Sequence, residues 1–162
     1  MQEIPEFWRT EVFHPLSVHF PIALLVVAFL FKVVALRFSR EVWELGGTIL
    51  LIAGVITLWI AIFTGDIADG VVSRKICDPT ILKDHENLAW TTAWIFSGGL
   101  LLDLLRQLKY PVFRNIFTRL LMILLLAIGT GTLGYTGHLG ATLVYQQAAG
   151  VYVPSGNCAE FE

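Results

Sequence analysis

The chain has 162 residues, of which 56% are hydrophobic and 15% are charged, and its mean hydropathy is +0.70. Soluble domains are about 45–50% apolar and about 25% charged, so this composition excludes a soluble globular enzyme, a disordered chain and a small disulfide-stabilised secreted domain. The net charge of −2, without a basic arm, also argues against nucleic acid as a partner.

Four apolar stretches follow one another along the chain, and each is long enough to cross the roughly 30 Å hydrocarbon layer of a bilayer as a helix. They cover about residues 14–38, 42–63, 86–105 and 112–144. In lipid, a helix satisfies all of its backbone hydrogen bonds internally. We therefore predict one all-α domain over residues 1–162, an integral membrane four-helix bundle.

Basic residues are distributed unevenly over the predicted connections. One end carries Arg37, Arg40, Arg106, Lys109, Arg114 and Arg119, whereas the other carries Arg9, Arg74, Lys75 and Lys83 among many acids. By the positive-inside rule the first end faces the cytoplasm, which puts both termini on the outer, periplasmic side. Within the spans, we expect Lys32 to reach the cytoplasmic interface and Asp103 to pair with Arg106 on its own helix.

The two cysteines, Cys77 and Cys158, both fall on the predicted outer side. An oxidising periplasm would allow a disulfide between them, and two unpaired thiols are the alternative. The sequence contains no CxxCH motif and no set of four cysteines. A covalently attached c-type haem and an iron–sulfur cluster are therefore not expected.

All the histidines, His14, His19, His85 and His138, fall at the predicted outer end of the bundle. Consecutive helices alternate in direction, so the starts of the first and third spans and the end of the fourth share one layer. His19 is expected to lie within the apolar layer, where an ionisable residue indicates function. Neutral imidazole binds haem iron, copper or zinc, although an interfacial histidine can also simply bond a carbonyl or a headgroup.

A haem b between facing helices takes axial histidines and needs small residues beside the porphyrin. His19 and His138 are the preferred pair, because a closed bundle brings the first span beside the fourth. His14 and His85 are then a second pair, or they support the ligands. Gly134 and Gly137 of the fourth span have no side chain, so they are expected to let the porphyrin approach the helix backbone. Close helix packing is the alternative role for these glycines.

Three motifs carry a resemblance to a known family: HPLSVHFPIALL at the start, DHENLA before the third span, and TGHLGATLVYQQAAGV at the end. Over about residues 12–153 the chain resembles the bacterial membrane-protein family called domain of unknown function 2231. The resemblance implies four spans in a prokaryotic membrane. Relatives are similar to domains joined to Rieske or cytochrome c modules, which implies electron transfer. The matching residues are His14, Pro15, His19, Phe20, Pro21, His85, Gly137, His138, Gly140, Leu143, Val144 and Tyr145, whereas Ala141 stands where the family pattern has glycine.

These observations favour a b-type haem-binding electron-transfer subunit over a stand-alone enzyme. Its expected partners are membrane lipid and other membrane or periplasmic redox subunits. Two alternatives stay open: a structural or assembly subunit of a larger membrane redox complex without its own cofactor, and a copper or zinc site near the periplasmic face. No buried acid or base is expected at mid-membrane, so an ion transporter is not favoured.

Overall fold

A computed structural model of the chain describes residues 6–38, 41–108 and 111–154. The short helices η1 (Thr10–Val12) and α1 (Phe13–Ser17) lead into α2 (His19–Arg37). The longer helices α3 (Glu41–Val72), α4 (Pro79–Gln107) and α5 (Ile116–Gln147) follow, with η2 (Pro111–Phe113) before the last. The described ranges contain helices and no strand, so the predicted all-α fold is confirmed.

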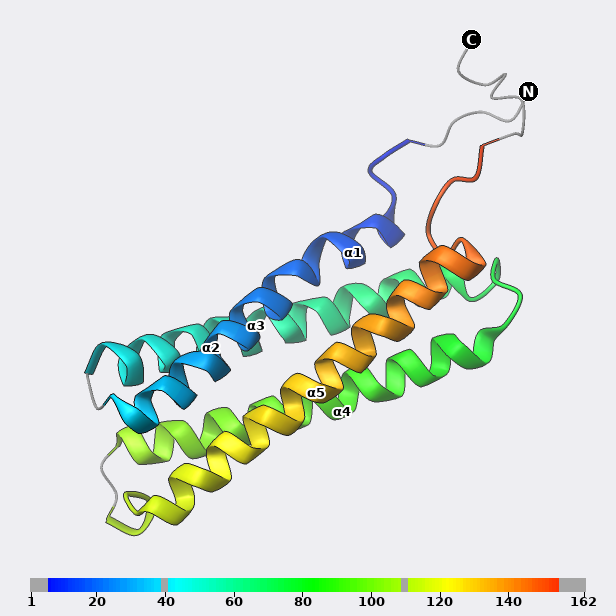
Figure 1. The fold of residues 1–162 in the computed structure, drawn as a ribbon. Coiled ribbons are helices and arrows are strands. Elements are labelled where there is room, and N and C mark those ends of the chain that lie inside the picture. The colour runs from blue at the N-terminus through cyan, green and yellow to red at the C-terminus, as the bar shows by residue number, and fades with distance from the viewer. Residues whose placement is uncertain (1–5, 39–40, 109–110, 155–162) are drawn as a thin grey trace.

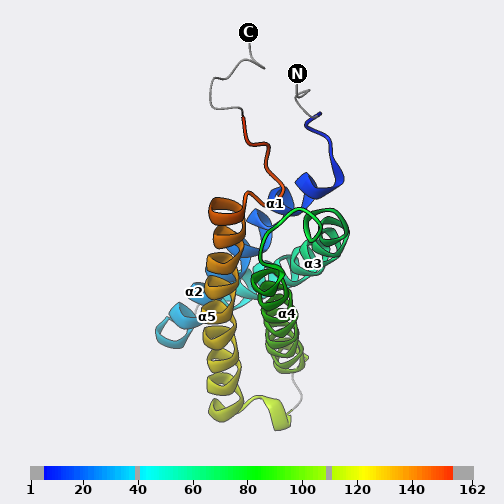
Figure 2. The same ribbon diagram turned by 90° about the vertical axis from the view of Figure 1, so that its right-hand side faces the viewer.

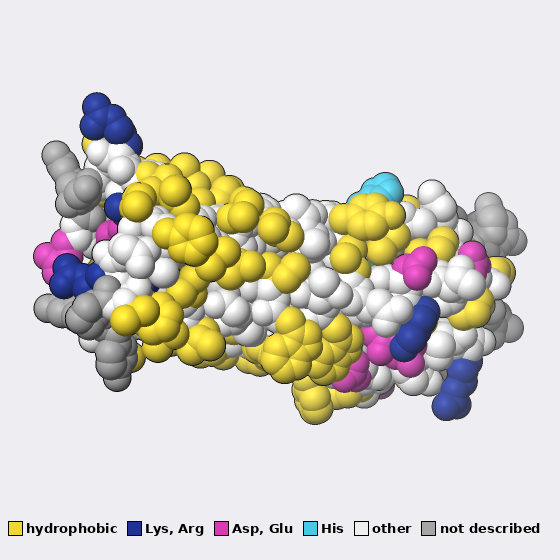
Figure 3. Space-filling model, turned by 90° about the horizontal axis from the view of Figure 1, so that it is seen from below, with side chains coloured by type: hydrophobic (Ala, Val, Ile, Leu, Met, Phe, Trp, Pro, Cys, Tyr) yellow, Lys and Arg dark blue, Asp and Glu magenta, His cyan; other side chains and the backbone are white. Residues whose placement is uncertain are grey.

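The helices form two antiparallel hairpins that pack against each other (Figures 1 and 2). The first hairpin packs η1, α1 and α2 against α3, and the second packs α4 against α5. Among the described residues, four segments are long and apolar enough to cross a membrane: Thr10–Arg37, Glu41–Val72, Pro79–Gln107 and Ile116–Gln147. Figure 3 shows hydrophobic side chains over the middle of one face and charged side chains at both ends, as expected for a bundle whose middle lies in lipid.

Two helices are longer than the apolar stretches from which they were predicted. Helix α3 continues to Val72, and α4 already begins at Pro79. Apolar length measures the lipid-facing part of a helix, and both helices extend past it. Local signals mark the start of α4, because Asp78 caps it and Pro79 fits the first turn. The hydroxyl and the N–H of Thr80 both donate to the Asp78 carboxylate, which lowers its pKa.

Glycines bring the helices of each hairpin close together. In the first hairpin Leu25 of α2 lies against Gly54 of α3, where a Cβ would come within 2.6 Å of the Leu25 side chain. In the second hairpin Phe96 of α4 lies against Gly129 of α5, with a corresponding distance of 3.0 Å. Leu25 and Phe96 are fully buried. Gly54 and Gly129 therefore allow close packing of the two helices in each hairpin.

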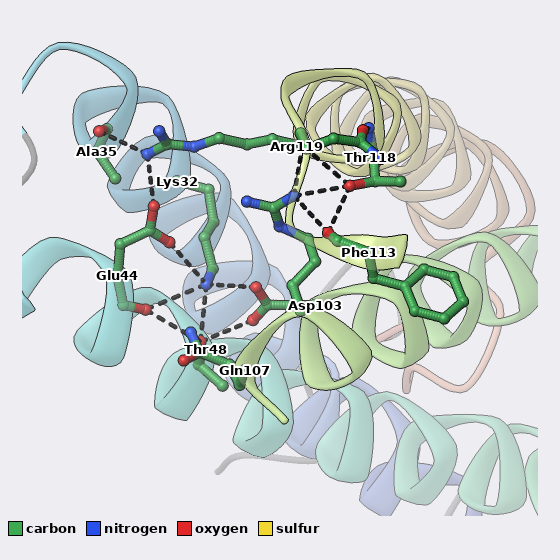
Figure 4. Close-up of polar contacts among 11 residues, drawn as sticks. Lys32, Ala35, Glu44, Thr48, Asp103, Gln107, Phe113, Thr118 and Arg119 are labelled. Carbon is green, nitrogen blue, oxygen red and sulfur yellow. Dashed lines mark hydrogen bonds and ion pairs between the residues drawn. The ribbon is translucent and has the colours of Figure 1, made fainter. Parts of the chain in front are cut away.

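Buried charges join the two hairpins at one end of the bundle, which we call the Lys32 end (Figure 4). The fully buried Nζ of Lys32 in α2 donates to Asp103 Oδ1 of α4 at 2.7 Å and to Thr48 Oγ1 of α3 at 2.7 Å. The Thr48 hydroxyl lies 2.7 Å from the other carboxylate oxygen of Asp103, to which it donates. Both oxygens of the buried carboxylate are therefore satisfied by side chains of the first hairpin.

Arg119 extends this network to the fourth long helix. Its guanidinium donates to Glu44 Oε1 of α3 and, at 2.7 Å, to the carbonyl of Ala35 in α2. The other oxygen of Glu44 lies 3.6 Å from Lys32 Nζ. Side chains at the Lys32 end thus connect α2, α3, α4 and α5 with two cations and two anions (Figure 4).

Two expectations for this end are wrong. Lys32 does not reach the membrane surface, because its side chain is 0% exposed, and Asp103 pairs with Lys32 rather than with Arg106. Arg106 instead donates to backbone carbonyls and to the Thr118 hydroxyl. Spacing along one helix identifies neighbours on that helix only, whereas Lys32 and Asp103 are 71 residues apart. A buried acid and a buried base are therefore present within the spans.

We predict that Lys32→Met destabilises the protein by about 3–5 kcal/mol, because Asp103 is left as a buried charge without its cation. The double variant Lys32→Met with Asp103→Leu removes both charges and should recover most of this loss. Thermal unfolding in detergent measures both changes. The matched control is Lys83→Met, which breaks the exposed pair with Glu86 and should have little effect. Equal losses in the single and double variants would contradict the pairing.

Candidate functional site

The opposite end of the bundle, which we call the histidine end, contains a cavity of about 370 Å³ between the two hairpins. It is lined by apolar side chains such as Leu58 and Leu133, and also by Glu11 and Gly150. Helix α3 lines it from Leu58 to Val72, about 20 Å at a rise of 1.5 Å per residue. The volume lies within the range of about 300–1,000 Å³ that is usual for small-molecule and cofactor sites.

His14 of α1 and His85 of α4 come from opposite hairpins and meet in this cavity, which both side chains line. Their ring centroids are 6.0 Å apart, and the ring planes make an angle of 82°. Two imidazoles bound trans to one metal ion, with bonds of about 2.0 Å, have centroids about 6 Å apart. The two rings therefore have a separation that suits joint binding of one metal ion.

A backbone carbonyl of the partner helix holds each of these two rings. His14 Nδ1 donates to the carbonyl of Ala61 in α3 at 2.9 Å, and His85 Nδ1 donates to the carbonyl of Thr136 in α5 at 3.0 Å. A carbonyl oxygen only accepts, so Nδ1 carries the proton in both rings. Neither Nε2 atom has a hydrogen-bond partner among the described residues. A metal-binding histidine has this same arrangement, with one nitrogen oriented by the protein and the other free.

A glycine lies beside each of the two rings. A Cβ on Gly65 of α3 would lie 3.2 Å from the His14 ring, and a Cβ on Gly140 of α5 would lie 3.2 Å from the His85 ring. Each glycine follows the accepting carbonyl by four residues, so it lies one turn along the same helix face. The same arrangement of histidine, carbonyl and glycine is thus built once in each hairpin.

The other two histidines lie outside the cavity. His19 is exposed at the start of α2, and His138 is exposed on α5, where it stacks on Tyr135 with a centroid distance of 6.1 Å. The structure therefore brings His14 and His85 together, the second pair considered from the sequence, and leaves the preferred pair apart from the cavity. The assignment of any of the four as ligands stays a prediction.

Gly134 and Gly137, the two glycines predicted to lie beside a cofactor, differ in their position relative to the cavity. Gly137 lines the cavity, and no atom lies within 4 Å of the position that its Cβ would take. Gly134 is exposed and does not belong to the lining. A side chain at position 137 would therefore extend into open space of the cavity, whereas one at position 134 would extend outside it.

Three tryptophans connect the cavity wall to the outside of the bundle. Trp59 of α3 packs edge to face against Trp90 and Trp94 of α4, with centroid distances of 5.6 and 5.3 Å. The Trp59 indole also donates to Ser97 Oγ of α4 at 3.2 Å. Trp90 lines the cavity, whereas Trp94 is 63% exposed. The cluster therefore joins the hairpins beside the cavity and reaches the lipid-facing surface.

The predicted copper or zinc site needs further ligands beside histidine. Within residues 6–38, 41–108 and 111–154, no group of three or more His, Cys, Asp and Glu side chains could hold a metal ion. Cys77 is exposed in the connection between α3 and α4, and Cys158 lies outside the described residues, so their disulfide stays a prediction. Arg40 and Lys109, used to orient the chain, also lie outside them.

A family model described as "Predicted membrane protein (DUF2231)" matches residues 11–152, which include α1 to α5 and both histidines of the cavity. The chain belongs to this family. The resemblance seen in the histidine motifs is therefore confirmed, and the protein is a multi-pass membrane protein. No curated protein and no solved structure matches the chain.

We predict that Gly65→Val and Gly140→Val each displace the adjacent histidine ring and destabilise the protein by about 1–3 kcal/mol, the usual cost of overpacking. Gly134→Val is the matched control on α5, because no atom lies within 4 Å of its Cβ position. Thermal unfolding and the imidazole NMR signals measure the effect. Unchanged imidazole signals in both cavity variants would contradict the tight contact between glycine and ring.

Proposed function

We propose that this member of the DUF2231 family binds haem b through His14 and His85 and passes electrons between a membrane donor and a periplasmic carrier. The observation that carries this proposal is the pair of imidazoles 6.0 Å apart in the cavity. Each ring is oriented through Nδ1, which leaves Nε2 available. His19 and His138, the preferred pair from the sequence, are thus replaced by His14 and His85 as the proposed ligands.

The residues of the cavity fit this cofactor. His14 and His85 would hold the iron of haem b, whose remaining ligands come from the porphyrin. Apolar side chains such as Leu58, Ile62 and Leu133 line the cavity, and the open space beside Gly137 leaves room for a ring system. Bound haem supplies a one-electron couple between ferric and ferrous iron. The Nδ1–H bonds to the carbonyls of Ala61 and Thr136 limit rotation of the two rings.

The presence of two imidazoles in the cavity favours haem over a copper or zinc site. A zinc site takes three or four ligands from the protein, whereas the cavity offers a pair of imidazoles. The remaining alternative, a structural or assembly subunit, explains neither the free Nε2 atoms nor the open cavity around them. These features therefore support a role in which the protein itself holds a cofactor.

Charge supports the proposed orientation in a bacterial inner membrane. Arg37, Arg106, Arg114 and Arg119 lie near the Lys32 end, in or beside the connections between helices. The positive-inside rule assigns such an end to the cytoplasm. The histidine end, and with it the proposed haem site, then faces the periplasm, where a soluble electron carrier could reach it.

We predict that the protein purified from haem-replete cells has a Soret band that shifts on reduction with dithionite. His14→Ala and His85→Ala should abolish this band, because each removes one axial ligand. His19→Ala and His138→Ala are matched controls and should retain it, since both side chains are exposed outside the cavity. The visible spectrum of each folded variant is the measurement.

A second pair of variants tests the cavity while keeping every histidine. Gly137→Leu places a side chain in the cavity and should reduce haem content, whereas Gly134→Leu should not. A colourless, folded wild-type protein would overturn the proposal. Bound copper or zinc without a Soret band would support the metal alternative, and copurification of large partners without either signal would support the structural one.

A further inference from the structure

The cavity reaches the surface of the bundle between the first hairpin and α5. Pro15 of α1 and Ile22 of α2 both line the cavity and are exposed, and their spacing in the sequence puts them on one helix face. On α5, Gly137 and Ala141 also line the cavity and are exposed, one turn apart on one face. Residues that line the cavity and are also exposed mark an opening, which we call the α5 opening.

Polar contacts hold α1 on α3 and do not cross the α5 opening. His14 Nδ1 donates to the carbonyl of Ala61 in α3 at 2.9 Å, and the hydroxyls of Ser17 and Thr64 lie 2.8 Å apart. Among the described residues, no hydrogen bond or ion pair joins α1 to α5. Helix α2 is bonded to α5 at the Lys32 end, through Arg119. The edges of the α5 opening can therefore separate without breaking a polar contact between them.

The α5 opening lies on a part of the bundle that contacts lipid. Both helix edges that bound it belong to segments long and apolar enough to cross a membrane. On the first hairpin, the side chains of Leu16, Phe20 and Ile22 are 45%, 63% and 41% exposed. Water around such side chains is unfavourable, whereas the hydrocarbon layer accommodates them. A molecule dissolved in the lipid layer can therefore reach the α5 opening without passing through water.

The opposite side of the cavity, between α3 and α4, is acidic. Asp66 lies two turns after Trp59 on α3, and Glu86 lies one turn before Trp90 on α4. Because Trp59 and Trp90 are in contact, Asp66 and Glu86 lie on the facing edges of the two helices, and both line the cavity. Along the described helices α1, α2 and α5, no Asp, Glu, Lys or Arg lines the cavity. An apolar ligand that enters beside α5 therefore displaces no water from a carboxylate, which would be costly between α3 and α4.

We infer that the ligand of the cavity enters from the lipid layer through the α5 opening, between Pro15 and Ile22 on one edge and Gly137 and Ala141 on the other. The inference rests on the proposed function, in which this ligand is haem b, a flat and largely apolar molecule. Glycine and alanine leave the α5 edge without bulky side chains. A large side chain on this edge narrows the route and leaves the two histidines in place.

The test measures how fast haem b enters and leaves the full-length protein in phosphatidylcholine vesicles. Haem-free protein is mixed with haem-loaded vesicles, and growth of the Soret band gives the association rate. Excess apomyoglobin outside the vesicles then captures released haem and gives the dissociation rate. We expect Ala141→Trp to slow both rates by roughly 10-fold, within the range that association rates span among variants of one site. A narrower route raises the barrier equally in both directions, so the affinity should be nearly unchanged.

Ala89→Trp is the matched control, because it makes the same substitution in the cavity lining on α4, one turn from Glu86. Its association rate should stay near that of the wild type. Ile22→Trp, on the other edge of the α5 opening, should slow both rates as Ala141→Trp does, and it decides the test if Ala141→Trp does not fold.

Three results overturn the inference alone: unchanged rates in both α5-opening variants, a slower association in Ala89→Trp than in Ala141→Trp, or a loss of affinity through faster dissociation only. The last result would mean that the new side chain fills the binding site instead of narrowing the route. Failure of the wild type to bind haem b overturns the proposed function and the inference with it.

Discussion

The buried ion pair between Lys32 and Asp103 sets the relative position of the two hairpins. Moving either charge into an apolar interior costs several kcal/mol, so any arrangement that separates them is strongly disfavoured. Thr48 satisfies the second oxygen of the carboxylate, and Glu44 and Arg119 balance the remaining charge. The helices are thereby aligned at one end of the bundle. Packing is more extensive within the hairpins than between them, and the cavity lies between the hairpins at the other end.

This alignment matters because each hairpin contributes half of the site. His14 rests on α3 and His85 rests on α5, and the two rings meet only if α1 and α4 are in the correct register. A shift of α4 by one residue would move His85 by about 1.5 Å and turn it by about 100°. The charges at the Lys32 end thus act on the histidine end through the rigid helices, although no side chain is common to both.

Hydropathy and the alternation of helix direction predict the four spans and the common layer of histidines, because both follow from short-range properties of the chain. The rotation of each helix about its axis does not follow from them. It decides that His14 and His85 face inward while His19 and His138 do not. The Lys32–Asp103 pair and the roles of Gly65 and Gly140 depend likewise on which helix is the neighbour. Pro79 and the capping Asp78 are local sequence signals for the start of α4, and this start places His85 inside the helix.

The tryptophan cluster beside the cavity makes intrinsic fluorescence a reporter of ligand binding in the cavity. Trp59, Trp90 and Trp94 are three of the five tryptophans of the chain; Trp59 packs against the other two, and Trp90 lines the cavity. Their near-ultraviolet emission overlaps the absorption of coloured, conjugated molecules. Any such molecule that enters the cavity therefore quenches the intrinsic fluorescence of the bundle, so occupancy can be followed in intact membranes without a label.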